Sequence, residues 1–440
     1  MKIRMIALVM VLYCSTIAAQ VTNYLGPGIL TRGASDIGTR AGQDVDLRFF
    51  INATGIFDNG LEPYSVTPTG KLVTVNGLWG TEISAGAYGV HNFRHGRLGL
   101  DYKGTYRHYT DKTFYDGTDQ TLALGYTYQK SRRLLFDLRQ LAGTLSQGTS
   151  FAGGLPSVTD ALVTPSSFLF DNQASYLQSS LDATWLKSGR TSFTVGGEGF
   201  GIWRKATGLI GMEGYDLHGT VQHRLSQHTT IGVAFQHSHF DYPKAFGESD
   251  INMFSGILGT QFGRYWTFAA KAGAYQAEVQ GLQQVSVDPQ IAALLGVYTT
   301  VQTFYKKSIF PTWDLSLTRR FQRASLSFGY ADGVSAGNGV YLTSRQESAN
   351  GTFSYIATTK WSFSASSGYT HLRGIAQGLQ PYTMINGGGG ITYALTKPIH
   401  IIARYDARHQ EIVEGVFKGT SYRATLGISF SPGDVPLAFH

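Results

Sequence analysis

Short basic turns recur along this chain at a nearly fixed interval, and each one separates two segments in which apolar and polar residues alternate. The turns centre near His95, Ser131, Ser188, Gln227, Arg264, Phe321, Thr359 and Lys397, so that successive steps are 36, 57, 39, 37, 57, 38 and 38 residues. A repeat of this length with a two-residue alternation inside it is typical of a repeated β-hairpin. The two long steps correspond to one hairpin each with an enlarged loop.

The start of the chain has the organisation of a secretory signal. Lys2 and Arg4 precede the apolar run from Ile6 to Leu12, and small residues at Ala18 and Ala19 supply a cleavage region. The run is too short for a transmembrane helix, and no later segment has the roughly 18 consecutive apolar residues that such a helix needs. We therefore expect residues 1–19 to be a signal peptide and residues 20–43 to be a periplasmic lead-in.

Cys14 is the only cysteine, and it lies inside the signal. The bulky Tyr13 before it does not suit lipoprotein processing. The mature chain is then expected to contain neither disulfides nor thiolate metal sites.

The composition favours a β-rich protein without choosing between a membrane barrel and a soluble sandwich or propeller. Aromatic residues make up 13%, charged residues 15%, and 54 residues are glycine, which fits neither a disordered chain nor a helical membrane protein. Removal of Lys2 and Arg4 lowers the formal net charge from +7 to +5. Since no basic cluster is interleaved with stacking aromatic residues, no nucleic-acid partner is expected.

The alternation of apolar and polar residues predicts an even number of strands. In the last segment Tyr422, Leu426 and Phe430 share one face, whereas Arg423 and Thr425 share the other. Eighteen such segments follow one another from residue 44 to residue 430, with sixteen as the alternative count. An even number places both chain ends on one side, so residues 431–440 are expected to form a periplasmic tail.

The spacing Thr425-x-Gly427-x-x-Phe430 resembles the C-terminal signal by which outer-membrane barrel proteins are recognised during assembly. The whole mature chain resembles a bacterial outer-membrane β-barrel of the porin type. The resemblance implies an all-β, transmembrane, antiparallel up-and-down barrel in the bacterial outer membrane. It also implies outer-membrane lipid and the barrel assembly machinery as partners.

Aromatic residues gather where the strands meet the basic turns, which predicts a girdle at one membrane interface. A soluble sandwich would instead bury its aromatic residues in the middle of the strands. The predicted girdle consists of Phe93, Tyr128, Trp185, Phe262, Trp266, Tyr355, Trp361 and Tyr393.

The turns themselves carry many cations, among them Arg190, Arg264, Arg319, Arg320 and Arg323. On the barrel interpretation these side chains lie within reach of phospholipid phosphates at the periplasmic rim. The alternative is that they are simply solvated turn charges.

Two enlarged loops lie opposite the turns, over residues 145–173 and 280–308. In the second loop, Asp288 has the place of a helix N-cap, Pro289 that of the first helical residue and Gly296 that of the residue after the helix. This pattern predicts a short helix over residues 290–295. Such a helix folds into the lumen or lies outside it, and the sequence does not decide between them.

No motif for a cofactor or an enzyme stands out. The glycine run 387–390 lacks the Lys-Ser/Thr pair of a nucleotide loop. His237 and His239 with Glu213 have metal-ligand residue types, but exposed polar histidines explain them better. A lipid hydrolase would need a serine signature near an outward histidine such as His223, and none is found. We expect no metal, no cofactor and no enzyme activity, with a lipid-modifying enzyme as the weakest alternative.

The polar faces carry charges that predict a lined lumen. The basic candidates are Arg48, Lys103, Arg107, Arg139, Arg404, Arg408 and Arg423, and the acidic ones are Asp46, Asp101, Asp137, Asp182, Glu198 and Asp406. If the first strand pairs with the last, Arg48 is expected beside Arg423. Charges facing a wet lumen tune ion selectivity, although they can also pair along the wall and stabilise neighbouring strands.

The sequence thus predicts a channel for passive diffusion of small hydrophilic solutes, with a weak preference for anions. The alternative hypothesis, from a different functional class, is an accessory barrel of an envelope system, such as polysaccharide export or surface attachment.

Overall fold

The computed structural model describes residues 48–59, 65–66, 72–73, 77–110, 116–146, 173–205, 209–286, 299–337, 339–375, 380–412 and 417–431. The predicted signal peptide, the lead-in, most of the predicted tail and Asp46 lie outside these residues.

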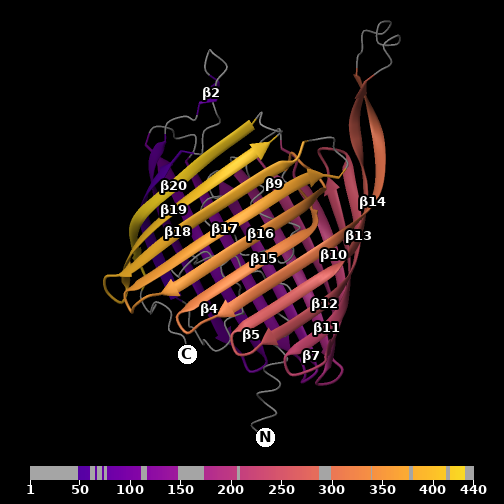
Figure 1. Cartoon of the computed structure of the whole chain (residues 1–440), viewed down its shortest axis with the longest axis horizontal. Helices are drawn as coiled ribbons and strands as arrows, with labels where there is room; N and C mark the ends of the chain where they lie inside the picture. The colour runs from indigo at the N-terminus through magenta and orange to yellow at the C-terminus, as the bar shows by residue number, and fades with distance from the viewer. Residues whose placement is uncertain are drawn as a thin grey trace.

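The described chain is built from twenty β-strands (Figure 1). Their bounds are β1 Arg48–Asp58, β2 Ser65–Val66, β3 Leu72–Val73, β4 Leu78–Asn92, β5 Gly96–Tyr109, β6 Gly117–Gln129, β7 Leu134–Ser146, β8 Gln173–Leu186, β9 Thr191–Arg204, β10 Met212–Arg224, β11 Thr229–Tyr242, β12 Gly247–Phe262, β13 Trp266–Ser286, β14 Thr299–Arg320, β15 Ala324–Ser335, β16 Ser344–Ile356, β17 Trp361–Gly374, β18 Tyr382–Ala394, β19 Ile399–Ile412 and β20 Phe417–Phe430. Within this part of the chain, no helix is long and apolar enough to cross a membrane.

Eighteen of these strands form one closed antiparallel sheet, and only the short pair β2 and β3 stands apart. Each strand pairs with the next along the chain, and β1 closes the barrel by pairing with both β4 and β20. The predicted up-and-down barrel and the count of eighteen strands are confirmed. We call the end with the short basic turns the turn end and the opposite end the loop end.

The two-residue alternation decides which side chains face outward. On β20, Leu426 and Ile428 are 64% and 56% exposed on the outer surface, whereas Arg423 and Ser429 point inward and are almost fully buried. Successive side chains of a strand point to opposite faces of the sheet, so the same pattern places apolar residues outside around the whole wall.

Several turns at the turn end share one local structure. Ser131 accepts hydrogen bonds at its Oγ from the N–H groups of Arg133 and Leu134. Ser188, Ser226 and Thr358 bond the corresponding residues of their own turns in the same way. A hydroxyl that satisfies two turn N–H groups stabilises a tight connection between antiparallel strands.

The predicted bounds of the second enlarged loop, residues 280–308, are wrong, because strand extends over residues 280–286 and 299–308. β13 runs on to Ser286 and β14 begins at Thr299, and the two pair from Ser286↔Thr299 down to Trp266↔Arg319. Since β15 pairs with β14 only from Trp313 downward, the upper part of this hairpin projects beyond the barrel (Figure 1). The predicted helix over 290–295 lies outside the described residues.

Candidate functional site: the barrel lumen and a loop across its mouth

The outer surface of the barrel is apolar, and its aromatic residues collect at the strand ends. Trp185 and Phe193 stack at 5.6 Å and Trp361 contacts Tyr393 at 4.6 Å between ring centroids, both pairs at the turn end. Among the predicted girdle residues, Phe93, Tyr128, Phe262 and Tyr355 are exposed on this surface, and Trp266 is half-buried. A closed barrel that is apolar outside and polar inside is a transmembrane β-barrel, because it leaves no strand edge unpaired in lipid.

A loop at the other end of the barrel reaches far from the strands that it connects. Residues 336–343, which we call the strap, join β15 to β16; residue 338 lies outside the described part. Ala336, Tyr341 and Thr343 are almost fully buried. Gly337 and Gly339 adopt positive φ values of 80° and 88°, a conformation that favours glycine and lets the strap change direction.

Hydrogen bonds attach the strap to distant parts of the wall. The Tyr242 hydroxyl on β11 lies 3.0 Å from both the Ala336 carbonyl oxygen, to which it donates, and Thr343 Oγ1. Thr343 Oγ1 also contacts Ser249 Oγ of β12 at 2.5 Å. The N–H of Ile210, between β9 and β10, donates to the Gly339 carbonyl oxygen at 3.0 Å. Five strands, β11 to β15, separate β10 from β16 in the sheet, so the strap crosses the inside of the loop end.

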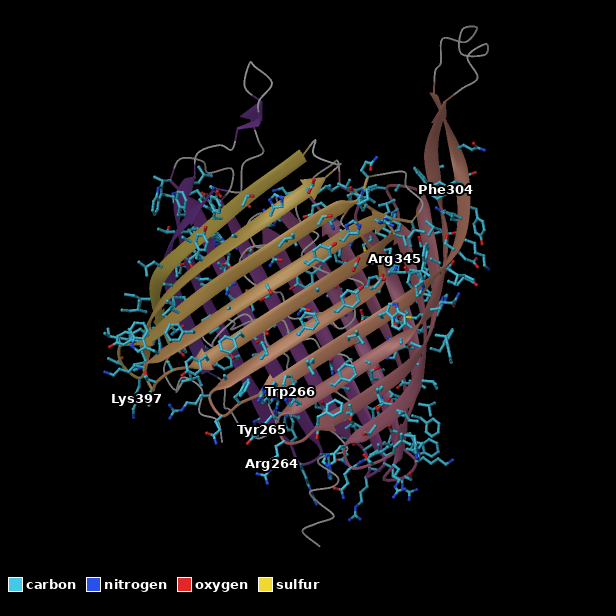
Figure 2. All side chains as sticks on the ribbon, in the orientation of Figure 1. Arg264, Tyr265, Trp266, Phe304, Arg345 and Lys397 are labelled. Atoms are coloured by element: carbon cyan, nitrogen blue, oxygen red, sulfur yellow. The ribbon has the colours of Figure 1, made fainter. Side chains whose placement is uncertain are left out.

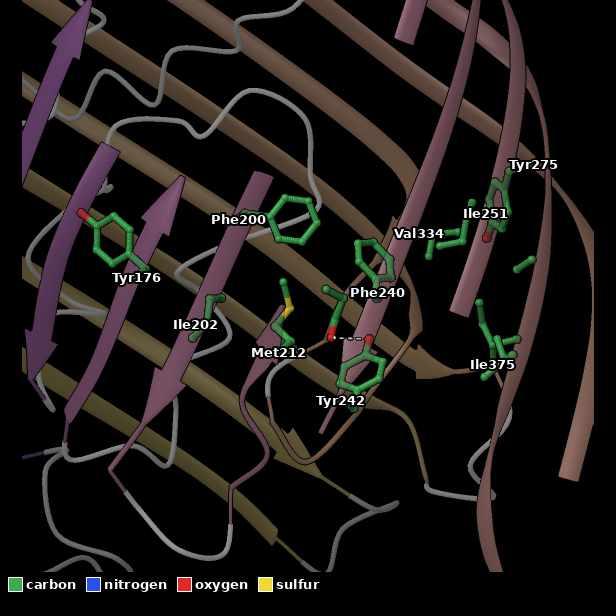
Figure 3. Close-up of a cluster of buried hydrophobic side chains, with 13 residues drawn as sticks. Tyr176, Phe200, Ile202, Met212, Phe240, Tyr242, Ile251, Tyr275, Val334 and Ile375 are labelled. Carbon is green, nitrogen blue, oxygen red and sulfur yellow. Dashed lines mark hydrogen bonds between the residues drawn. The ribbon is translucent and has the colours of Figure 1, made fainter. Parts of the chain in front are cut away.

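The strap packs against an apolar cluster on the inner wall. Figure 3 shows this cluster, in which Phe240 and Tyr242 of β11 lie near the strap. The other members are Tyr176, Phe200, Ile202, Met212, Ile251, Tyr275, Ala277, Val279, Val334, Ala336 and Ile375. Burial of this apolar surface holds one side of the strap against the strands from β8 to β13. On its other side, Tyr341 packs in a second buried cluster with Leu372 of β17 and with Tyr382 and Met384 of β18.

A network of buried charges crosses the seam where the barrel closes. Glu82 of β4 accepts hydrogen bonds at Oε2 from Arg107 Nε of β5 and from Arg423 Nη2 of β20, each at 2.7 Å. Arg107 also pairs with Asp119 of β6 and donates to Ser146 Oγ of β7 at 3.1 Å. We call these residues the seam network. Because β1 lies between β4 and β20, the shared carboxylate links β4 and β5 to the last strand of the barrel across β1.

The predicted place of Arg48 beside Arg423 is wrong. Arg423 pairs across the seam with Asp58, whereas Arg48 begins β1 at its other end and pairs with Tyr88 of β4. The first and last strands are antiparallel neighbours as expected, but their register moves Arg48 ten residues along β1 from the position opposite Arg423.

The other predicted lumen charges lie mostly in pairs along the wall. Arg404 binds Asp406 through two nitrogen atoms at 2.6 and 2.5 Å, and Arg139 Nε lies 3.1 Å from Asp137 Oδ1. Lys103 and Asp101 of β5, Arg408 of β19 and Glu198 of β9 also point inward. Both pairs join residues of one strand, so these charges offset one another along the wall.

An acidic cluster with one histidine lies on the opposite wall. His218 of β10 contacts Asp182 Oδ1 of β8 at 2.8 Å through Nε2 and Asp216 Oδ1 at 3.1 Å through Nδ1. Ser238 donates to the second oxygen of Asp216. Eight strands separate β10 from β19 in either direction around the barrel, so this cluster faces the arginines of β19 across the lumen.

Two glycines make room for these clusters. A Cβ at Gly196 of β9 would overlap the Asp182 carboxylate and approach His218 Nε2 to 2.7 Å, and a Cβ at Gly388 of β18 would overlap the Asp406 carboxylate. Gly388, within the glycine run 387–390, therefore lets Asp406 lie against the wall.

The outward histidines are held by other side chains. His237 Nδ1 contacts Asn252 Oδ1 at 2.9 Å, His239 Nδ1 contacts Asp250 Oδ1 at 2.8 Å, and His223 Nδ1 contacts the hydroxyl of Thr191 at 3.0 Å. Glu213 instead accepts a hydrogen bond from Trp203 Nε1. Among the described residues, no group of three or more histidine, cysteine or acidic side chains is placed to hold a metal ion.

Comparisons with known proteins give similarity at the level of solved structures. OccK2 (OpdF) of Pseudomonas aeruginosa is 9% identical, with a TM-score of 0.43 over 88% of this chain and 98% of that one. A BenF-like porin from Pseudomonas fluorescens is 10% identical, with a TM-score of 0.42 over 88% and 99%. OccAB1 of Acinetobacter baumannii is 9% identical, with a TM-score of 0.39 over 90% and 100%. No family model and no curated protein matches the chain.

The sequence analysis missed the strap. The segment from Gly333 to Thr343 reads as a short glycine-containing loop, but Val334, Tyr341 and Leu342 within it are unusually apolar for an exposed connection. Apolar residues inside a loop indicate that the loop is buried against something. That signal is local, whereas the partners on β11 and β12 are about a hundred residues away.

Proposed function

We propose that this chain is a bacterial outer-membrane channel for the passive diffusion of small hydrophilic solutes. The observation that carries the proposal is a closed eighteen-stranded barrel with a charged inner wall and one loop across its mouth. A barrel of this size is wide enough to enclose an aqueous passage. On this assignment the turn end faces the periplasm and the loop end faces the outside of the cell.

The strap divides the mouth of the lumen unequally. Its contacts with Tyr242, Ser249 and Ile210 attach it to the arc from β8 to β13. Tyr341 attaches it on the other side to β17 and β18. The arc from β19 to β6, which carries the seam network, receives none of these hydrogen bonds. Solutes are then expected to pass along this second arc, where charged and hydroxyl groups replace part of their hydration.

Because the charges of the lumen are paired, we expect the channel to have no strong ion selectivity. Arg107, Arg404 and Arg423 all bind carboxylates, so each positive charge is largely offset where it lies. The weak preference for anions that the sequence predicts stays a prediction. It depends on how much positive charge is left after this pairing at the narrowest point of the lumen.

Conductance in planar lipid bilayers tests the proposal directly. Purified protein is expected to give discrete steps in potassium chloride, and replacement of residues 336–343 by an Asn-Gly turn is expected to enlarge each step. A folded barrel that shows no steps, with or without the strap, would overturn the channel assignment.

The projecting β13–β14 hairpin favours one second candidate, an accessory barrel of an envelope assembly. Ile309 on its outer face is 70% exposed, and Tyr305 beside it is also exposed. Exposed apolar residues beyond the membrane are suited to contact with another protein. Co-purification of one stoichiometric partner that is lost when Tyr305 and Ile309 are both replaced by serine would favour this role.

The final strand supports recognition by the barrel assembly machinery. Phe430 faces outward at the end of β20, and Thr425 and Gly427 precede it on the strand that closes the seam.

The outward histidines give no support for a lipid hydrolase. His223 contacts the hydroxyl of Thr191, and His237 contacts the side-chain amide of Asn252. A lipid-release assay on the purified protein tests that point.

A further inference from the structure

Arg319 places a positive charge on the outer face of the barrel among apolar side chains. The register puts Trp266 of β13 on one side of Arg319 and Leu326 of β15 on the other. The same row continues to Phe262 and Phe353, and the side chains of Phe262, Leu326 and Phe353 are exposed. A cation among lipid-facing residues is unfavourable unless something compensates its charge.

Two aromatic rings hold the Arg319 guanidinium in place. Its Cζ lies 4.7 Å from the centre of the Trp266 ring and 4.3 Å from that of Phe321. The rings fix the plane of the group, but they supply no hydrogen-bond acceptor along its edge. Arg319 Nε is buried and has no hydrogen-bond partner within the described part of the chain.

The surrounding turns add positive charge. Residues 260–269 and 316–327 contain four arginines, namely Arg264, Arg319, Arg320 and Arg323, and no carboxylate. The N–H of Arg320 donates to the Tyr265 carbonyl oxygen at 2.9 Å, which ties the two neighbouring turns together. Arg264 and Tyr265 lie at the rim of the barrel away from the projecting hairpin, next to Trp266 (Figure 2).

We propose that this site binds the phosphate of an anionic phospholipid from the membrane leaflet at the turn end. The phosphate accepts hydrogen bonds from Arg319, whose planar fork matches two phosphate oxygens. Arg264, Arg320 and Arg323 add to the positive field around it. The acyl chains lie against Phe262, Leu326 and Phe353, which a free phosphate would not use. The proposal rests on the membrane position of the barrel but not on its being a channel.

The test measures retention of phosphatidylglycerol on the full-length barrel by native mass spectrometry after incubation in detergent. The wild type is expected to retain one lipid, and Arg319→Leu is expected to retain it at least fivefold less. Arg319→Lys keeps the charge but loses the fork, so intermediate retention is expected. Arg190→Leu, which removes an exposed cation from the turn between β8 and β9, serves as the matched control.

Heat-modifiable migration on a gel confirms that each variant is folded before retention is compared. Equal retention by the wild type and Arg319→Leu would overturn the proposal, as would an equal loss in Arg190→Leu, since rim charge in general would then be responsible. Conductance of Arg319→Leu is expected to match the wild type because the side chain faces outward. A loss of channel activity in the wild type itself would sink the proposed function and leave the lipid site standing.

Discussion

The Tyr242 hydroxyl on β11 donates a hydrogen bond to the Ala336 carbonyl oxygen, 94 residues further along the chain. The same hydroxyl contacts Thr343 Oγ1, so one phenol bonds both ends of the strap. Ala336 directly follows β15 and Thr343 directly precedes β16.

Replacing Tyr242 by phenylalanine is expected to loosen the strap without emptying the apolar cluster. Phenylalanine keeps the ring but removes two hydrogen bonds, each with a net contribution of about 1 kcal/mol. Single-channel recordings are expected to show more frequent transitions and a larger open conductance than the wild type.

The matched control for Tyr242 is Tyr275→Phe in the same cluster. Tyr275 is equally buried, but its hydroxyl has no hydrogen-bond partner among the described residues. Its removal is expected to leave the recordings unchanged. If both variants behave alike, the hydrogen bonds of Tyr242 do not hold the strap.

Glu82→Gln is expected to shift the channel toward anions. The carboxylate is shared by Arg107 and Arg423, and its loss leaves two buried cations with less compensation, at a cost of about 3 kcal/mol in stability. The reversal potential in a potassium chloride gradient measures the shift. Glu278→Gln, which removes the same charge from the β13–β14 hairpin, is the control and is expected to leave the reversal potential unchanged. A shift of the same size in this variant would contradict an effect within the lumen.

The Asp116 carboxyl at the loop end gives a pH-dependent local contact. Burial raises its pKa, but hydrogen bonds from the Tyr109 N–H and from His108, both at 2.7 Å, outweigh this and lower the pKa below its usual value. A carboxyl with a depressed pKa stabilises the fold above its unfolded-state pKa of about 4, and this stabilisation is lost as the pH falls through the lower folded-state value.

Hydrogen exchange, corrected for intrinsic rates, is therefore expected to show weaker protection at the end of β5 as the pH falls below about 4. Asp116→Asn is expected to show the weaker protection at neutral pH as well. Asp241→Asn, the same change at the exposed end of β11, serves as control. Protection at β5 that does not vary with pH in the wild type would contradict the role of Asp116.

The wall of this barrel was predictable because its signal is local and repeated. Two-residue alternation and the recurring basic turns indicate strand, face and connection independently at each hairpin, so the prediction of eighteen strands needed no long-range information. The outward position of Trp185 and Trp361 followed from the same pattern.

The register and the lumen were not predictable in the same way. Whether Arg48 or Asp58 lies opposite Arg423 depends on how the ends of the chain meet across the seam, and alternation alone does not determine that shift. The sharing of Glu82 by arginines from β5 and β20 requires the closed barrel. The β13–β14 extension was not predicted because polar residues occur on both faces of residues 280–286. A strand that leaves the membrane needs no apolar face, so its sequence resembles that of a loop.

Gly427 is expected to be essential for closing the seam. A Cβ at this position would overlap the Ala53 carbonyl oxygen and come within 2.5 Å of Thr54 Cα on β1. Because both are backbone atoms of the pairing strand, they cannot move aside without breaking the β1–β20 pairing. Gly427→Val is expected to lower the fraction of heat-modifiable, folded barrel several-fold.

Gly199→Ala is the control, because a Cβ there meets nothing within 4 Å, and it is expected to fold as the wild type does. Normal folding of Gly427→Val would show that the seam tolerates a shift of β1, and that the glycine in the final strand serves recognition during assembly and not the closure itself.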